Sequence, residues 1–231
     1  MTVALVRPPD AATKSALPFA ACLSSESTEW ATPRDFLAAM ARRWGRFWLD
    51  AAATRATTAA PAWYDREQDG LAQSWEPPPG ERGPVWLNPP YGVDEKACVP
   101  ACAKKRCVRR GFHLSSPVPG IGAWMNKARD EALRWGGPVV TLPPARPDTR
   151  WWRDALLRQP EAAGRYVGSM ADPYGGPFAA LWPTLEWRLY RWEHLVVEVA
   201  NLEGRLSFGQ QGKVHPAPFP SACVAFYAPG R

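Results

Sequence analysis

The clearest hydrophobic repeat predicts an amphipathic helix in the first fifth of the chain. Its apolar positions recur with the spacing of one helix face and are Phe36, Leu37, Met40 and Trp44. Thr32 is expected to be the N-cap, with Pro33 in the first helical position, and Gly45 is expected to end the helix.

Short apolar runs further along predict buried strands that alternate with helical patterns. The early runs cover residues 47–50, 85–87 and 139–142. Helices are expected at 122–135 and, after Asp148 or Thr149 as a cap, through Trp152 to Leu156. Residues 54–83 are expected to form loops with one short helical stretch.

The last apolar runs have no helical pattern between them. They lie at 196–199, 206–208 and 223–227. Early alternation followed by consecutive strands predicts an α/β protein with a mixed sheet, parallel at first and carrying an antiparallel hairpin at one edge. Residues 1–27 show no periodicity and are expected to be a flexible N-terminal extension. Residues 160–194 have no clear pattern and are expected to be an insertion whose role stays open.

Composition narrows the class of protein. The 231 residues are 46% hydrophobic, enough for a substantial core, and carry a formal net charge of +6. No run of about 18 apolar residues predicts a membrane span. Pro8, Pro9, Asp10 and Lys14 interrupt any secretory signal at the N-terminus. We therefore expect a cytoplasmic, mildly basic globular protein. The sequence does not determine the oligomeric state, although so small a protein could act as a monomer.

Asn88-Pro89-Pro90-Tyr91 directly follows a predicted strand and is the most informative tetrapeptide. Its acceptors suit the methylation of an amine on an aromatic base: the Asn88 side-chain carbonyl and the Pro89 backbone carbonyl can accept hydrogen bonds from the amine and localise its lone pair. The prolines keep both acceptors in place, and Tyr91 offers a stacking face. The alternative is an ordinary proline-rich turn in a chain with 26 prolines.

Several blocks accompany this tetrapeptide in a fixed order. They lie at residues 30–33, 49–54, 69–71, 85–92, 122–124, 140–146, 204–209 and 217–221. Together they resemble the phage-type DNA N-6-adenine-methyltransferases, the Dam-like family of phages and prophages. The resemblance implies a Rossmann-like S-adenosylmethionine-dependent methyltransferase fold over residues 28–231, double-stranded DNA as substrate and protection from host restriction.

The resemblance also implies positions for the cofactor. Residues expected near S-adenosylmethionine are Trp30, Thr32, Pro33, Asp50, Ala51, Ala52 and Asp69. The chain has no Gly-x-Gly after its first strand and carries alanines there instead. For Asp50 and Asp69 the alternative is a strand-end or turn carboxylate that accepts backbone hydrogen bonds.

A cysteine-rich segment, residues 93–119, looks like an insertion. Cys98, Cys102, Cys107 and His113 have the short spacing of a structural zinc knuckle. The alternatives are a metal-free cluster of reduced thiols or another metal such as iron. Basic residues in the same segment are expected to contact DNA phosphates, the alternative being a solvated charged surface; they are Lys104, Lys105, Arg106, Arg109 and Arg110.

Two rival functions stay open at the level of sequence. The same loop suits a methyltransferase acting on adenine in RNA or on glutamine in a protein, because each presents an amino group on a conjugated carbon. A non-catalytic, zinc-containing nucleic-acid-binding module is the rival from another class. Target sequence is not readable from these patterns.

Overall fold

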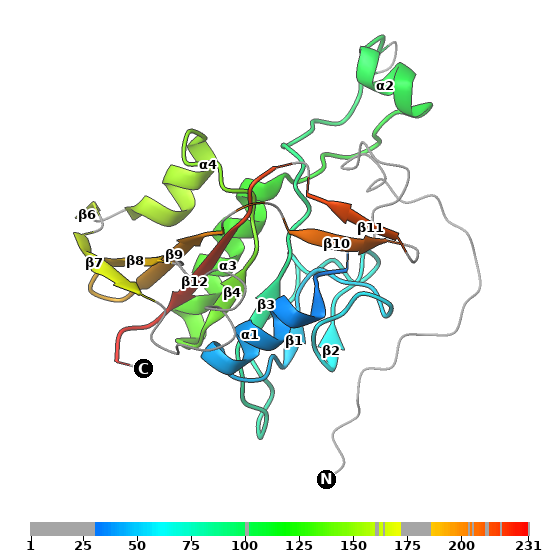
Figure 1. Ribbon diagram of the computed structural model, residues 1–231. Helices are drawn as coiled ribbons and strands as arrows, with labels where there is room; N and C mark the ends of the chain where they lie inside the picture. Colours follow the sequence, from blue (N-terminus) through cyan, green and yellow to red (C-terminus); the bar gives the residue numbers. More distant parts are fainter. Residues whose placement is uncertain are drawn as a thin grey trace.

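The computed structural model describes residues 31–99, 102–159, 162–163, 165–171, 186–202, 204, 206–210, 213–217 and 219–230 (Figure 1). The expected N-terminal extension, residues 1–27, and the proposed cofactor residue Trp30 lie outside these ranges. No helix in the described part of the chain is long and apolar enough to cross a membrane.

Eight of the described strands form one mixed sheet in the order β2-β1-β3-β4-β12-β9-β8-β7. The strands of its parallel half are β1 (Leu49–Asp50), β2 (Ala62–Trp63), β3 (Val85–Leu87) and β4 (Val139–Thr141). The antiparallel half comprises β7 (Arg165–Ala171), β8 (Glu186–Arg191), β9 (Val196–Asn201) and β12 (Ala222–Tyr227). The expected mixed α/β class is confirmed.

The antiparallel part is larger than the single edge hairpin that the sequence predicts. β7 and β8 come from the segment without a clear pattern and extend the main sheet at its edge. The expected strand at 206–208 is β10 (Ser207–Gln210), which pairs with β11 (Lys213–Pro216) in a separate two-stranded sheet. A further short pair joins β5 (Arg158–Gln159) to β6 (Ala162–Ala163).

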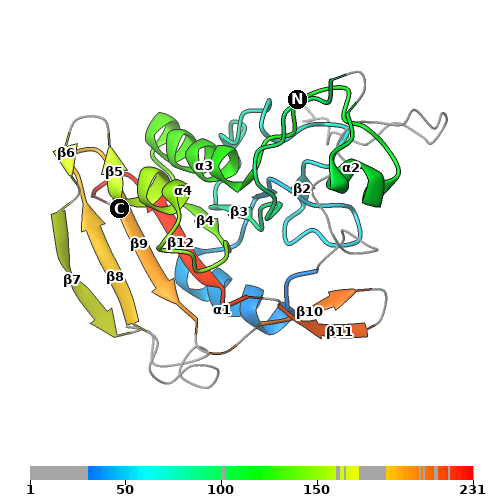
Figure 2. The same cartoon turned by 90° about the horizontal axis from the view of Figure 1, so that it is seen from above.

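Helices cover both faces of the sheet (Figure 2). Helix α3 (Ile121–Trp135) packs on one face against Val85 and Leu87, whereas α1 (Arg34–Trp44) packs on the other against Trp86. Successive side chains of β3 therefore enter opposite cores, as the two-residue period of a strand requires. All three residues of β3 are buried, which is typical of a central parallel strand.

Helix α1 confirms the apolar repeat, but the expected cap is wrong by one residue. Pro33 is the N-cap, with φ and ψ of −55° and 135°, and the Thr32 hydroxyl lies against the Asn88 side chain. The Pro33 carbonyl accepts the first backbone hydrogen bond, from Leu37 at 3.0 Å. Gly45 is the C-cap, as expected.

The expected helix after residue 149 is found, whereas the helical stretch expected within residues 54–83 is not. Thr149 is the N-cap of α4 (Arg150–Trp152), which continues as a π-helical turn, η2 (Arg153–Leu157). Its hydroxyl donates to the Arg146 carbonyl rather than capping the helix. Residues 54–83, all of which the structure describes, contain turns and the short strand β2 instead of the expected helical stretch.

Candidate active site

In the parallel half of the sheet, the side on which successive strands are added reverses at β1. β2 lies on one side of β1 and β3 on the other, so the carboxyl ends of β1 and β3 flank a topological switch point. Open α/β sheets bind ligands outside the carboxyl ends of their strands at such a point. The residues at these two ends are Asp50 and Asn88, which the sequence had singled out for chemistry.

Asn88 is held by two side chains from other parts of the site. Its Oδ1 accepts a hydrogen bond from the Tyr91 hydroxyl at 2.5 Å, and its Nδ2 lies 3.4 Å from Thr32 Oγ1 as donor. Pro89, the next residue, is buried, and Pro90 is half-buried. The amide is therefore oriented from both ends, with acceptor capacity left on Oδ1 because a carbonyl oxygen has two lone pairs.

Tyr91 is a neutral phenol whose ring is partly exposed. Burial raises the pKa of Tyr91 far above its ordinary value, so the hydroxyl stays protonated and acts as a hydrogen-bond donor. The Leu142 carbonyl, directly after β4, lies 3.1 Å from the same hydroxyl. The loop is thus connected to the carboxyl end of the neighbouring strand.

Phe219 is a site residue that the sequence reasoning did not single out. Its ring meets the Tyr91 ring edge-to-face, with 5.0 Å between centroids and 83° between planes. Phe219 lies in the last of the family-like blocks, at 217–221, but no local spacing shows that it reaches Tyr91. Both rings are partly exposed, and Tyr91 also contacts Asn88 through its hydroxyl.

Asp50 ends β1 with a buried carboxylate. Its oxygens accept hydrogen bonds from the backbone N–H groups of Ala59, at 2.9 Å, and Ala52, at 3.4 Å. Burial raises the pKa of Asp50 to about 7, although the two backbone hydrogen bonds lower it. Asp50 therefore makes the strand-end contacts of the structural alternative, and the switch point also places it beside the proposed ligand site.

Ala51 and Asp69, two more of the proposed cofactor residues, lie near the end of β1. The Ala51 N–H donates to the Trp86 carbonyl at 2.9 Å. Asp69 is exposed, has a positive φ of 51° and accepts from the Leu71 N–H within its own turn. A Cβ on the next residue, Gly70, would lie 2.2 Å from the Ala51 carbonyl oxygen, so only glycine allows this approach.

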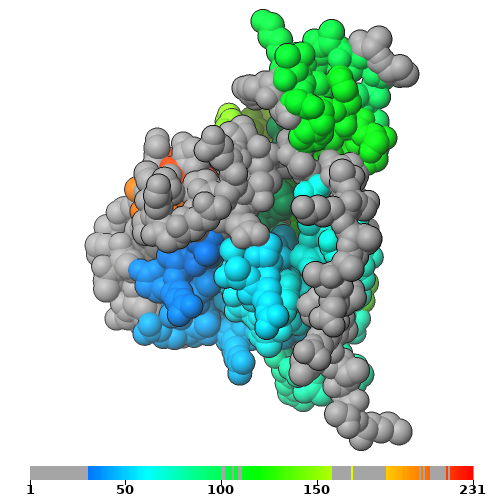
Figure 3. All heavy atoms as spheres, turned by 90° about the vertical axis from the view of Figure 1, so that its right-hand side faces the viewer, coloured from blue at the N-terminus to red at the C-terminus, as the bar shows by residue number. Residues whose placement is uncertain are grey.

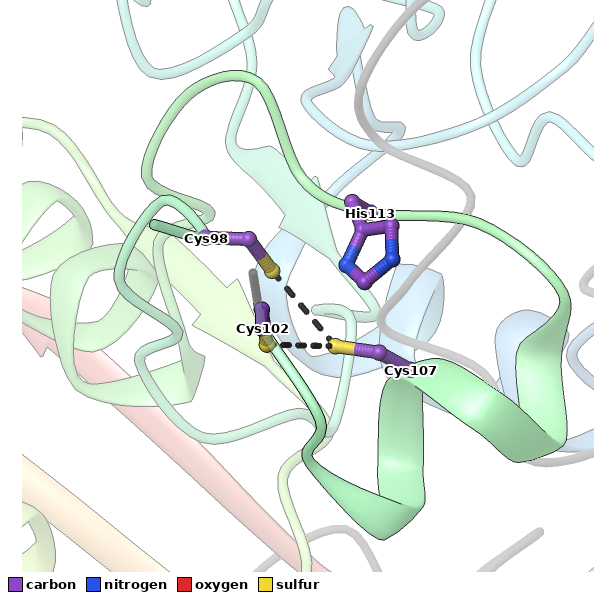
Figure 4. A group of neighbouring side chains, drawn as sticks. All are labelled: Cys98, Cys102, Cys107 and His113. Atoms are coloured by element: carbon purple, nitrogen blue, oxygen red, sulfur yellow. Dashed lines mark hydrogen bonds between the residues drawn. The ribbon is translucent and has the colours of Figure 1, made fainter. Parts of the chain in front are cut away.

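A second cluster lies in the segment between the loop and α3. Cys98, Cys102, Cys107 and His113 converge there, and their potential ligand atoms all lie within 4.8 Å of one another (Figure 4). The Leu114 N–H, first among several donors, and the His113 side chain lower the pKa of the Cys98 thiol to about 6. The four side chains therefore converge as their spacing in the sequence predicted.

The basic residues predicted to contact DNA lie on or just before α2 (Lys105–Arg110) in this segment. Lys104 is the N-cap residue, and both Lys104 and Lys105 are exposed. Arg106, Arg109 and Arg110 belong to the same helix, and their side chains lie outside the described part of the structure.

Comparison with known proteins assigns the class of protein. The family model described as DNA N-6-adenine-methyltransferase (Dam) matches residues 20–163, more than half of the 231 residues, and the chain belongs to this family. The match includes the loop, Asp50 and the Cys/His cluster. It confirms the family that the sequence blocks indicated, and its matched range ends before β7.

A curated relative agrees with the family. The DNA N-6-adenine-methyltransferase of Escherichia phage T1 is 31% identical over 108 residues, which cover 45% of this chain and 41% of the relative. The chain therefore matches less than half the length of that protein. No solved structure gives a significant match.

Proposed function

We propose that this protein transfers a methyl group from S-adenosylmethionine to the exocyclic amine of an adenine that is flipped out of double-stranded DNA. The observation that carries the proposal is the position of Asn88 and Asp50 at the two strand ends of the switch point. Membership of the DNA N-6-adenine-methyltransferase family supports the same reaction. The Rossmann-like methyltransferase fold is part of this proposal.

The loop would act through hydrogen-bond acceptors. The Asn88 Oδ1 and the Pro89 carbonyl would accept from the adenine amine, turning its lone pair away from the ring and toward the incoming methyl. Tyr91 and Thr32 hold the Asn88 amide in one orientation before substrate arrives, which is preorganisation. Tyr91 is protonated, so it orients Asn88 and does not act as a base.

The adenine ring would be held by the aromatic pair. Tyr91 and Phe219 are both half-exposed and lie edge-to-face, so they border the same space beside Asn88. Base–aromatic stacking contributes about 1–3 kcal/mol per base, comparable with the cost of removing one base from the duplex. We propose Phe219 as an addition to the base-binding residues Asn88, Pro89, Pro90 and Tyr91.

The residues at the end of β1 fit a cationic cofactor. Asp50 is buried, and its hydrogen-bond partners in the described part of the chain are the backbone N–H groups of Ala59 and Ala52; burial has raised its pKa to about 7. A cation beside it would favour the ionised form. S-adenosylmethionine supplies a methyl group on a positively charged sulfur, and its ammonium group adds a second positive charge.

The remaining proposed cofactor residues would contact other parts of the same molecule. Thr32 and Pro33 would lie near its carboxylate, and Ala51 and Ala52 beside its methionine end. Asp69 is a candidate for binding its ribose or adenine.

The test is transfer of radiolabelled methyl from S-adenosylmethionine to unmethylated duplex DNA, followed by nucleoside analysis. We expect N-6-methyladenine from the wild type and a roughly 100- to 1,000-fold slower transfer from Asn88→Ala, with cofactor affinity nearly unchanged. Asn201→Ala, at the exposed end of β9, is the matched control and should transfer normally.

Other outcomes would replace the proposal. Methylation of RNA adenine or of protein glutamine, with DNA left unmodified, would reassign the substrate. A chain that binds duplex DNA without binding the cofactor would instead be a nucleic-acid-binding module. Equal loss of transfer and cofactor binding in Asn88→Ala would contradict the role given to its side chain.

A further inference from the structure

Residues 93–119 form an arm that leaves and rejoins the protein at one narrow neck. The Gly92 carbonyl accepts from the Ile121 N–H at 2.8 Å, and Glu95 and Val118 exchange two backbone hydrogen bonds. A Cβ on Gly120 would lie 2.4 Å from the Asp94 nitrogen, so the two sides touch through backbone. Beyond this neck the arm stands off the sheet as a separate lobe (Figure 3).

The arm has too little apolar material to fold by burial. Among its described side chains, the buried apolar ones are Cys107, Leu114 and Val118. Val93, Val99 and Val108 are 63%, 69% and 73% exposed. Segments far below about 40 residues rarely hold a fixed structure without a disulfide, a metal ion or a partner. The arm therefore needs a cross-link, such as a metal ion, in place of a hydrophobic core.

We propose that Cys98, Cys102, Cys107 and His113 bind one structural zinc ion that fixes the arm. Cys107 Sγ lies 3.4 Å from Cys98 Sγ and 3.6 Å from Cys102 Sγ (Figure 4). Tetrahedral zinc with Zn–S bonds of about 2.3 Å places its sulfur ligands about 3.8 Å apart. The sulfurs are thus close to the required separation, and the His113 ring completes the set.

The surroundings of the cluster also suit a thiolate–metal site. The Leu114 N–H points at Cys98 Sγ from 3.3 Å, while the Cys98 N–H donates to the Leu114 carbonyl at 2.8 Å. Backbone N–H groups directed at ligand sulfurs are the usual outer-shell partners of bound thiolates. Three thiolates and an imidazole fill all four zinc positions, so the site is structural rather than catalytic.

The position and charge of the arm suggest what the zinc ion is for. The arm follows the Asn88–Tyr91 loop directly and contains six basic and two acidic residues, a net charge of +4 in a chain whose total is +6. This inference rests on the proposed function: the zinc-fixed arm would hold Lys104 and Lys105 against the phosphates of the duplex beside the target adenine.

The first experiment measures metal, independently of methylation. Protein purified without added metal is analysed by inductively coupled plasma mass spectrometry, with circular dichroism as the check on folding. We expect about one zinc per chain in the wild type and in Cys223→Ala, a buried cysteine outside the cluster, and less than about a tenth in Cys102→Ser. Stoichiometric iron, a zinc-free wild type after incubation with zinc chloride under reducing conditions, or zinc retained by Cys102→Ser would overturn the site.

The second experiment measures binding of a fluorescent duplex with S-adenosylhomocysteine present, so that no methyl transfer occurs. Cys102→Ser should weaken DNA binding at least about tenfold and leave cofactor affinity unchanged. Lys104→Ala/Lys105→Ala should lower the slope of log affinity against log salt by up to about 1.8.

The matched control for charge is Arg46→Ala/Arg82→Ala, which removes two exposed positive charges before β1 and β3, at the opposite end of the sheet. Its salt slope should equal that of the wild type. Equal effects of the two double variants would overturn the DNA role of the arm. Failure of methyl transfer in the wild type would sink the proposed function but leave the zinc measurement intact, so the two failures are distinguishable.

Discussion

The sheet and the arm are held together in different ways. The sheet buries large side chains on both faces; Trp75, Trp86, Trp187, Phe36 and Phe226 are among those with almost no exposed surface. The arm has three described buried apolar side chains and four convergent ligands. Apolar burial is non-directional and tolerates substitution, whereas a ligand set depends on every member. The two parts should therefore fail independently and under different conditions.

The largest expected effect is the loss of unfolding free energy when the buried Arg43–Glu198 pair of the sheet region is broken. Arg43 of α1 pairs with Glu198 of β9, both side chains being 5% exposed, and its guanidinium lies 4.1 Å from the centre of the Trp187 ring. Arg43→Met leaves the Glu198 carboxylate buried without its cation and should lower the free energy of unfolding by about 3–5 kcal/mol. Urea unfolding measures this.

The control is Arg42→Met, which changes the preceding, exposed residue of the same helix and should cost little. Zinc content should be the same in both variants and the wild type. A loss of zinc in Arg43→Met would show that the arm depends on the sheet core and would break the comparison.

The pH dependence of the two regions should have opposite signs. The pKa of Asp50 is about 7 in the folded chain against an ordinary value of 3.8, so the folded state holds its proton more tightly. Its contribution to stability is complete below pH 3.8 and is lost as the pH rises through 7. Zinc binding by thiolates and imidazole strengthens over the same range because the ligands must lose protons.

The contribution of Asp50 to this pH dependence is measured by urea unfolding of the cofactor-free protein at pH 5 and pH 8. Relative to Asp50→Asn, which does not titrate, the wild type should lose on the order of 2 kcal/mol of unfolding free energy between these pH values. Identical pH profiles for the two proteins would mean that Asp50 is ionised throughout, and the burial argument would be wrong.

The smallest effect on the sheet is expected from metal removal. Chelation should shift the unfolding free energy of the sheet by less than about 1 kcal/mol, because the neck hydrogen bonds and both cores do not use the ligands. Limited proteolysis of the chelated protein should cut within residues 93–119 first. Cleavage outside the arm at the same rate, or a large loss of sheet stability, would show that the two regions fold as one.

Local patterns predicted the elements whose causes are local. The repeat of Phe36 and Met40 predicted α1 because apolar residues at this spacing lie on one face of a helix, which can then be buried. The four proposed zinc ligands are close in sequence, so short chain segments bring them together. β2 was missed because two residues are too few to show a period, and β8 because Trp187 is the one buried side chain among its six residues.

Long-range contacts explain the remaining differences. Threonine is a residue type that N-caps prefer, but the Thr32 hydroxyl lies against Asn88, and Pro33 is the N-cap. The contact of Phe219 with Tyr91 joins the last part of the chain to the loop, and no pattern near either residue encodes it. The roles of Asp50 and Asp69 toward a cofactor stay predictions, since both make the backbone hydrogen bonds of ordinary strand ends and turns.

The neck between Gly92 and Ile121 makes the arm an exchangeable part. Its two ends are one hydrogen bond apart, so a short turn could replace the whole segment without moving β3 or shifting the start of α3. Insertions of different length and charge could be grafted at the same point. Such a junction, directly after the Asn88–Tyr91 loop, would let related chains change how they grip their substrate while the sheet and its strand ends stay the same.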